Sequence, residues 1–88
     1  MRLDLYLKGS RLCPRRSVAQ QLCEAQLVFV NGHPAKPAHN VKPDDEIIVR
    51  RHSHEKRVRV IKLPVAQQPR STATTLYELI SERDIADN

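Results

Sequence analysis

The sequence contains few aromatic residues. Its 88 residues include only three aromatic side chains, Tyr6, Tyr77 and Phe29, and no Trp. A single small domain with so few aromatic side chains must build its core from Leu, Val, Ile and Ala. The scarcity also disfavours RRM and OB domains, because these stack single-stranded bases on aromatic rings.

Glycine is equally scarce, since Gly9 and Gly32 are the only two. Two isolated glycines form neither a GxGxxG motif nor a P-loop. Cys23 is a poor nucleophile, because its helical phase places it in the core. The acids at 44–46 suit a turn, whose backbone they tolerate, better than a catalytic cluster. We therefore expect a protein that is not an enzyme and uses no cofactor.

Cysteine is limited to Cys13 and Cys23, ten residues apart and in no CxxC pattern. His52 and His54 form a close pair in an expected polar loop, but no cysteine has ligand spacing near them. This pattern predicts no metal site. The chain has no apolar run that would span a membrane and no apolar N-terminal signal. We expect reduced thiols and a cytoplasmic location without membrane association.

Negative charge is sparse over most of the chain. Residues 1–64 carry a net charge of +7 and residues 65–88 carry −2, which together give +5. A basic body indicates a polyanionic partner, either nucleic acid or an anionic membrane surface. The alternative is a solvated surface that only keeps the protein soluble.

Hydrophobic spacing predicts two helices and a hairpin in the first half. Leu3 and Leu7 share one helical face, and Val18, Leu22 and Ala25 line one face of a second, amphipathic helix. Asn-Gly after a β-branched run is a strong hairpin signal. The expected elements are a helix over 3–8, a turn over 9–14, a helix over 15–25, a strand over 27–30 and a turn at 31–32.

The second half predicts short strands and a terminal helix. Prolines restrict the strand after the hairpin turn to a sheet edge. Alternation separates the buried Val58 and Val60 from Arg57 and Arg59, and Thr75 with Glu78 fits a capping box. The expected elements are an edge strand over 33–38, a turn over 41–45, a strand over 47–49, a polar loop over 51–55, a strand over 56–63, a linker over 66–72 and a helix over 75–85. Residues 1–64 would form one domain, and residues 65–88 a linker and C-terminal helix.

Positive charge clusters around the turn between the two predicted helices. Arginine presents a planar fork of donors that grips phosphate, and the first turn of a helix offers free N–H groups to the same anion. The alternative is that these are ordinary solvated side chains. The candidate RNA-binding residues are Arg2, Lys8, Arg11, Arg15 and Arg16. A second, weaker candidate patch, whose alternative role is to prevent strand pairing at an exposed edge, contains Arg50, Arg51, Arg57 and Arg59.

The predicted second helix favours RNA over DNA as the partner. A DNA-reading helix aims polar side chains at base edges, whereas the strongest charges here gather where the helix begins. That placement suits recognition of the phosphates and shape of folded RNA. We therefore expect no DNA binding.

Four motifs occur in order over residues 1 to about 50: Arg2-Leu3-Asp4-x-x-Leu7, Arg16-x-x-Ala19, Val28-x-Val30-Asn31-Gly32 and Val41-Lys42-Pro43-x-Asp45-x-Ile47. This ordered set resembles the S4 RNA-binding domain. The resemblance implies an α+β fold, the S4 (αL) fold, in which two short N-terminal helices pack on a small, mostly antiparallel sheet. The helices and the adjacent hairpin would dock on structured RNA.

The whole-chain layout resembles small bacterial S4 proteins of ribosome-associated quality control, the RqcP (YabO-like) family, and their relative, the S4-type heat-shock protein. The first resemblance implies binding to an obstructed large ribosomal subunit and contact with 23S ribosomal RNA and tRNA. It also implies support for C-terminal alanine tailing by a partner that delivers alanyl-tRNA. The second implies recycling of free large subunits that carry a nascent chain. When the RNA contacts of the family are transferred by position, they fall on the five candidate residues around the turn between the two predicted helices.

Three positions depart from the family pattern. Gln26 and Asp44 stand where the family has glycine, so both are expected at left-handed backbone positions, with a cost of about 1 kcal/mol for Gln. Arg15 stands where some relatives place a Ser or Thr helix cap, so a cap is lost and a charge is added to the RNA face.

Two further functions compete with RNA binding. One is a protein-interaction module that dimerises through a strand edge or the tail helix, although we expect a monomer. The other is a fragment of an enzyme, because S4 domains are appended to pseudouridine synthases and tyrosyl-tRNA synthetases. The chain contains no catalytic domain, which counts against this second alternative.

Overall fold

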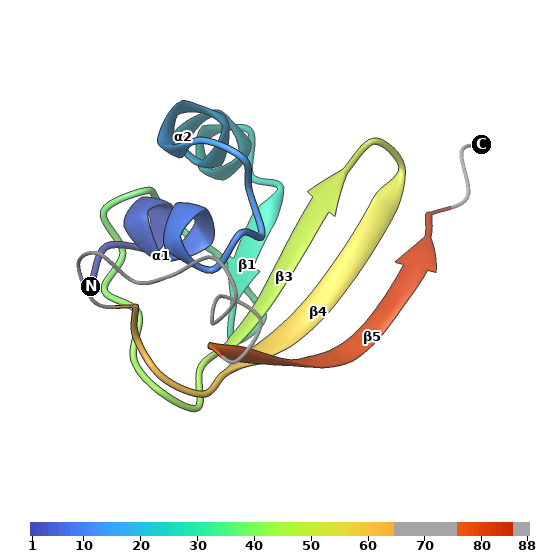
Figure 1. The fold of residues 1–88 in the computed structure, drawn as a ribbon. Helices are drawn as coiled ribbons and strands as arrows, with labels where there is room; N and C mark the ends of the chain where they lie inside the picture. Colours follow the sequence, from blue (N-terminus) through green and yellow to red (C-terminus); the bar gives the residue numbers. More distant parts are fainter. Residues whose placement is uncertain (65–75, 86–88) are drawn as a thin grey trace.

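A computed structural model describes residues 1–64 and 76–85, which form two helices and one five-stranded antiparallel sheet of order β2-β1-β3-β4-β5 (Figure 1). The helices cover one face of the sheet near β1, whereas β3, β4 and β5 extend past them (Figure 1). Neither helix in these ranges is long and apolar enough to cross a membrane. The elements are α1 (Leu3–Gly9), α2 (Arg16–Glu24), β1 (Val28–Val30), β2 (His33–Pro34), β3 (Glu46–Arg51), β4 (His54–Val60) and β5 (Tyr77–Asp84).

The core is mainly aliphatic, as the composition predicts, and lies between the helices and the sheet. From α1 it takes Leu3, Tyr6 and Leu7, all fully buried. Removing these side chains from water contributes about 1.5–3 kcal/mol each. The other main members are Ala19, Leu22, Val28, Val30, Val41, Ile47, Val49, Val58 and Val60.

Helix α2 buries the face that its spacing predicts, except at its end. Ala19 and Leu22 are buried, but Ala25 is exposed, so the expectation that Ala25 joins the core is wrong. Ala25 caps the helix, and Gln26 then adopts a left-handed conformation with φ 61°. The chain therefore leaves the helix before Ala25 can turn inward. The N-cap, Arg15, makes no side-chain capping hydrogen bond.

The turns match the sequence pattern closely. Asn31 and Gly32, at φ 52° and 86°, join β1 to β2, which fits the hairpin signal. Asp44 has φ 75°, so both left-handed positions inferred from the missing glycines are confirmed. Asn31 also donates to the carboxylate of Asp45, which accepts from the Lys42 N–H. These bonds fasten the two turns to each other.

The polar loop expected over 51–55 is wrong. β3 runs through Arg51, β4 begins at His54, and only His52 and Ser53 form the turn between them. Arg50 pairs with Glu55 across the two strands, with 2.8 Å between Arg50 Nε and Glu55 Oε1. A cross-strand ion pair stabilises polar residues in strands, and a search for apolar alternation misses it.

The terminal helix expected over 75–85 is also wrong, because Tyr77–Asp84 is strand β5. The linker expected over 66–72 lies outside the described residues. Leu79 and Ile80, which have helical spacing, are 50% and 44% exposed and do not form a buried helix face. Instead, β5 pairs with β4 along its length, with Glu78 opposite Arg59. Pairing with β4 overrides the local helical pattern, and it places β4 inside the sheet rather than at an edge.

A buried hydrogen bond anchors the start of β5 to α1. The Tyr6 hydroxyl donates to the Leu76 carbonyl oxygen at 2.9 Å, and Tyr6 is fully buried. Pro64 also packs against Gly9, where a β-carbon added to the glycine would lie 2.9 Å from the proline ring. The Tyr6 bond therefore ties the helical layer to the start of β5, and the Pro64 contact ties it to the segment that follows β4.

Replacing Tyr6 with Phe should lower the free energy of unfolding by about 1–2 kcal/mol, because the Leu76 carbonyl loses its buried donor. Urea denaturation measures the loss. Hydrogen exchange should accelerate first at the amides of residues 76–78. Unchanged stability and exchange would show that this bond does not hold β5.

Candidate nucleic-acid interface

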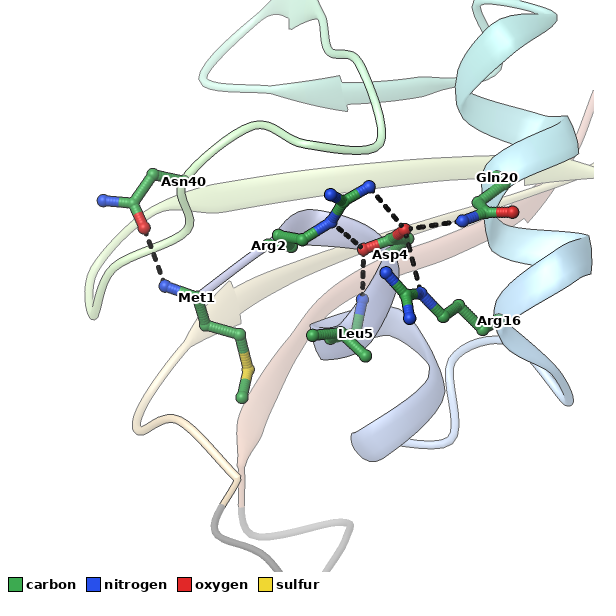
Figure 2. Close-up of polar contacts among 7 residues, drawn as sticks. All are labelled: Met1, Arg2, Asp4, Leu5, Arg16, Gln20 and Asn40. Atoms are coloured by element: carbon green, nitrogen blue, oxygen red, sulfur yellow. Dashed lines mark hydrogen bonds and ion pairs between the residues drawn. The ribbon is translucent and has the colours of Figure 1, made fainter.

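A buried carboxylate organises two of the five candidate arginine and lysine residues (Figure 2). Arg2 donates to both oxygens of Asp4 from Nε and an η nitrogen, each at 3.2 Å. Arg16 Nε donates to Asp4 Oδ2 at 3.2 Å, and Gln20 Nε2 donates to the same oxygen at 3.0 Å. The Asp4 side chain is fully buried, whereas the Arg2 and Arg16 side chains remain 46% and 45% exposed.

The Asp4 carboxylate is ionised at neutral pH despite its burial. Burial alone would raise its pKa, but hydrogen bonds from Arg2, Gln20 and Arg16 and from the Leu5 N–H lower the pKa to about 2. The interaction is mutual, because a fixed negative charge holds two guanidinium groups side by side. Without the carboxylate, two like charges that share one partner would repel.

Backbone pairing of the chain start fixes the position of Arg2. The Leu3 N–H donates to the His39 carbonyl at 2.8 Å, and the Val41 N–H donates to the Met1 carbonyl at 2.7 Å. The Met1 amino group donates to Asn40 Oδ1 at 2.7 Å (Figure 2). Arg2 is therefore held from both sides by segment 37–41 while its side chain reaches Asp4.

The remaining three candidates lie on the path from α1 to α2. Lys8 is in the last turn of α1, Arg11 is in the connection, and Arg15 is the N-cap of α2. All three side chains are exposed, and none forms an ion pair with an acid in the described ranges. Arg11 has φ 66°, a left-handed conformation that costs an arginine about 1 kcal/mol. The structure thus joins Arg2 and Arg16 through Asp4 and leaves three exposed cations on the path between the helices.

A family model described as the S4 domain matches residues 1–47, a segment that contains α1, α2 and most of the candidate surface. The chain belongs to the S4-domain family.

Relatives of this S4-domain protein match nearly its whole length. "RQC P-site tRNA stabilizing factor" from Halalkalibacterium halodurans is 41% identical over 87 residues, which cover 98% of this chain and 97% of the relative. Heat shock protein 15 from Escherichia coli is 30% identical over 82 residues, 93% of this chain and 62% of that protein. The structure of heat shock protein 15 from Vibrio cholerae superimposes with a TM-score of 0.82 at 30% identity and covers 92% of this chain and 82% of that one.

The second candidate patch of this S4-domain protein is divided between two faces of the sheet. Alternation along β3 and β4 places Arg51 on the helix-covered face and the other three arginines on the open face. Each of those three has an acidic neighbour. The pairs are Arg50 with Glu55 at 2.8 Å, Arg57 with Glu46 at 3.3 Å and Arg59 with Glu78 at 3.3 Å.

The open face is therefore a lattice of alternating charges. Glu55 is buried beneath Arg50 and Arg83, whose Nε atoms lie 2.8 and 2.9 Å from its two oxygens. Arg50 also stacks 4.8 Å from the centre of the Phe29 ring. These arginines bind the strands to one another, which leaves them less available to phosphate than the exposed cations at the first turn. The expectation that they guard an exposed edge is wrong, because β4 lies between β3 and β5.

Both cysteine thiols are buried and have a raised pKa. Cys13 and Cys23 are free thiols, both buried. Burial raises the pKa of Cys13, and burial together with nearby Cys13 raises the pKa of Cys23 to about 11. Thiols with raised pKa values are poor nucleophiles. Within residues 1–64 and 76–85 no group of three or more His, Cys, Asp or Glu side chains could hold a metal ion.

The sequence pattern does not reveal how two side chains of this cluster, Asp4 and Gln20, are used. The position of Asp4 in the first turn indicates only an acid that suits the positive end of its helix, and the phase of Gln20 indicates a solvated face. In the structure, Gln20 and Arg16 stand one helical turn apart and converge on Asp4. The spacing of Arg16 and Gln20 at i and i+4 is the available signal, but their shared partner lies on another helix.

His54 fastens the far end of β5 through two carboxylates. Its Nδ1 lies 3.0 Å from Asp84 Oδ1, and its Nε2 lies 2.7 Å from Glu82 Oε1. Both ring nitrogens face acceptors, so only the imidazolium form donates to both. The hydrogen bonds to Asp84 and Glu82 accordingly raise the pKa of His54 above its ordinary value of 6.5.

This arrangement predicts that the end of β5 loosens as pH rises. A raised folded-state pKa contributes stability below pH 6.5, and that stability is lost as pH increases through the folded-state pKa. A second contact of Glu82, with Lys56 Nζ at 3.7 Å, limits the effect. Hydrogen exchange of residues 82–85, corrected for intrinsic rates, should accelerate as pH rises above 6.5, the ordinary pKa of histidine. A His54→Gln variant should show a flat profile, and an equally steep one would refute the assignment.

Proposed function

We propose that this S4-domain protein is an RNA-binding factor of ribosome-associated quality control. It docks on an obstructed large ribosomal subunit and contacts 23S ribosomal RNA and the peptidyl-tRNA. The single observation that carries this proposal is the Asp4 carboxylate, which holds Arg2 and Arg16 together at the surface. The RNA-contacting residues in this proposal are Arg2, Lys8, Arg11, Arg15 and Arg16.

The geometry favours phosphate recognition. Two guanidinium groups that are already fixed lose little rotamer freedom when they bind a phosphate, so more of the interaction energy appears as affinity. Each guanidinium also keeps donors that face away from Asp4 and suit phosphate oxygens. The exposed cations Lys8, Arg11 and Arg15 extend the positive surface along the connection between the helices.

The role we propose is positional rather than catalytic. The protein holds the tRNA and the subunit in a productive geometry while a partner delivers alanyl-tRNA for C-terminal alanine tailing of the stalled chain. Its relatives are named as a tRNA stabilizing factor and a heat-shock protein, and these names describe no enzyme. Ribosome binding would place the protein in the cytoplasm.

Recycling of free large subunits in the manner of an S4-type heat-shock protein is the second candidate, which the TM-score of 0.82 favours. The share of each relative's length that the alignment covers favours the quality-control role. The chain aligns with 97% of the Halalkalibacterium factor but with only 62% of the Escherichia coli heat-shock protein. More than a third of the latter therefore has no counterpart in this alignment.

Sedimentation of the tagged protein from a bacterial lysate tests the proposal. We expect co-migration with the large subunit, co-purified tRNA and loss of binding as salt rises, because phosphate contacts release counterions. Mass spectrometry of the nascent chains that co-purify distinguishes the two roles, since stalled chains with alanine tails belong only to the first. A protein that stays at the top of the gradient at low salt would refute both.

Arg16→Ala should weaken binding to the large subunit about tenfold and reduce the dependence of log Kd on log salt by about one. The matched control is Arg59→Ala, which removes an exposed arginine that pairs with Glu78 on the open face. We expect the control to bind nearly as well as the unmodified protein. Equal binding by both variants would show that the surface around Arg16 is not part of the RNA interface.

A further inference from the structure

A small cavity opens beside the connection between α1 and α2. Its volume is about 230 Å³, below the 300–1,000 Å³ typical of sites for drug-sized ligands. A space of this size suits one planar ring system rather than a larger molecule. Its walls come from the connection and from the β3–β4 hairpin, and the lining residues are Leu12, Val49, Arg51, His52, His54 and Lys56.

The cavity combines an apolar floor with a positive rim. Leu12 and Val49 supply aliphatic surface. Arg51 is half-buried and forms no ion pair with an acid in the part of the chain that the structure describes. Two other lining residues, His54 and Lys56, are in contact with the Glu82 carboxylate. The positive charge that is available to a ligand therefore lies on the Arg51 side.

The hairpin beside the cavity adopts an unfavourable backbone. His52 and Ser53 have φ 54° and 58°, and a two-residue turn with both values positive normally uses Asn-Gly or Gly-Gly. A histidine there costs about 1 kcal/mol or more. Strained residues often occur at functional sites, and this one places an imidazole at the cavity rim.

We propose that this cavity binds one unpaired nucleotide of the RNA. The base packs on Leu12 and Val49, the Arg51 guanidinium stacks on the base, and the phosphate lies toward the Arg51 side of the rim, away from Glu82. Folded RNA offers such splayed bases in loops and bulges, and guanidinium planes stack on them as aromatic rings do. The proposal rests on the RNA-binding function above and adds a base-contacting site to a surface that otherwise contacts phosphate.

Binding of variants to salt-washed large subunits tests the site. Arg51→Gln should weaken binding about tenfold and Leu12→Ala about fivefold, the latter without a change in salt dependence because no charge is removed. Arg59→Gln is the control and should bind normally. Thermal melting verifies that each variant is folded. If both cavity variants bind like the unmodified protein while Arg16→Ala does not, the nucleotide site is wrong and the RNA-binding function stands.

A direct titration separates base from phosphate recognition without the ribosome. Adenosine or uridine 5′-monophosphate at millimolar concentration should shift the amide resonances of Leu12, Val49 and Arg51 in the full chain. Ribose 5-phosphate should shift them much less. Equal shifts from ribose 5-phosphate would show a phosphate site only, and no shifts from any of the three compounds would likewise overturn the proposal, whatever the subunit measurements give.

Discussion

Replacing Asp4 with Asn is expected to weaken binding to the large subunit about tenfold, although it removes a negative charge from a basic surface. Long-range electrostatics alone would predict tighter binding, because RNA is a polyanion. The structure predicts the reverse, because Asp4 holds the Arg2 and Arg16 guanidinium groups together. Without the carboxylate the two cations repel, their side chains regain rotamer freedom, and the RNA must order them again.

The same substitution should lower the free energy of unfolding by about 2 kcal/mol at pH 7. The pKa of Asp4 falls from its ordinary value of 3.8 to about 2 in the folded protein, and each pKa unit corresponds to about 1.4 kcal/mol. Because the folded-state pKa is lowered, this contribution is present above pH 3.8 and is lost as pH falls toward 2. The two proteins should therefore converge in stability near pH 2.

The control for Asp4→Asn is Glu24→Gln. Glu24 is an exposed acid in the last turn of α2, so its removal changes the net charge equally without releasing an arginine. Glu24→Gln should bind the large subunit slightly more tightly and unfold normally. If Asp4→Asn also bound more tightly, pre-organisation of the arginines would be excluded and net charge alone would govern affinity.

The parts of the fold that were predictable are those determined within a few residues. The face shared by Leu3 and Leu7 and the Asn31-Gly32 turn depend on local spacing and backbone preference. The left-handed conformations of Gln26 and Asp44 also followed from position in the motif and are confirmed. Local rules succeeded where the hydrophobic pattern and the final packing agree.

The two largest failures, which are the conformation of residues 77–84 and the role of Asp4, share one cause, namely pairing between segments distant in sequence. The residues of β5 have a helical pattern because of the spacing of Leu79 and Ile80, but cross-strand partners on β4 decide their conformation. The role of Asp4 was equally hidden, since its partners Arg16 and Gln20 come from another helix. Charges that pair only after folding leave no periodic signal in the sequence.

How well the candidate site could be predicted depends on the same difference between local and distant contacts. Its first cluster was visible because most of its cations are close in sequence. The second was misjudged as one patch, because consecutive residues Arg50 and Arg51 point to opposite faces of β3. Arg50 contributes to the cohesion of the sheet, whereas Arg51 lines the cavity. One arginine of the four thus remains without an acidic neighbour in the described ranges, and it is the one beside the connection that carries the first cluster.

Replacing His52 with Gly should raise stability and reduce nucleotide binding at once. Glycine accepts the φ of 54° without the steric penalty of a side chain, so the free energy of unfolding should rise by about 1 kcal/mol and Tm by about 4–8 °C. The same change removes the imidazole from the cavity rim, so the shifts caused by adenosine 5′-monophosphate should become smaller. Differential scanning calorimetry and the titration measure the two effects separately.

Gln26→Gly is the matched control for His52→Gly. It relieves a left-handed residue of similar φ, 61°, outside the residues that line this cavity. It should stabilise the protein by a similar amount and leave nucleotide binding unchanged. If His52→Gly stabilised the protein without weakening the nucleotide response, the strained turn would have no role in the cavity. If neither variant gained stability, the strain itself would be refuted. If both variants gained stability and only His52→Gly also lost part of its nucleotide response, the hairpin would retain an unfavourable residue because that residue contacts the ligand.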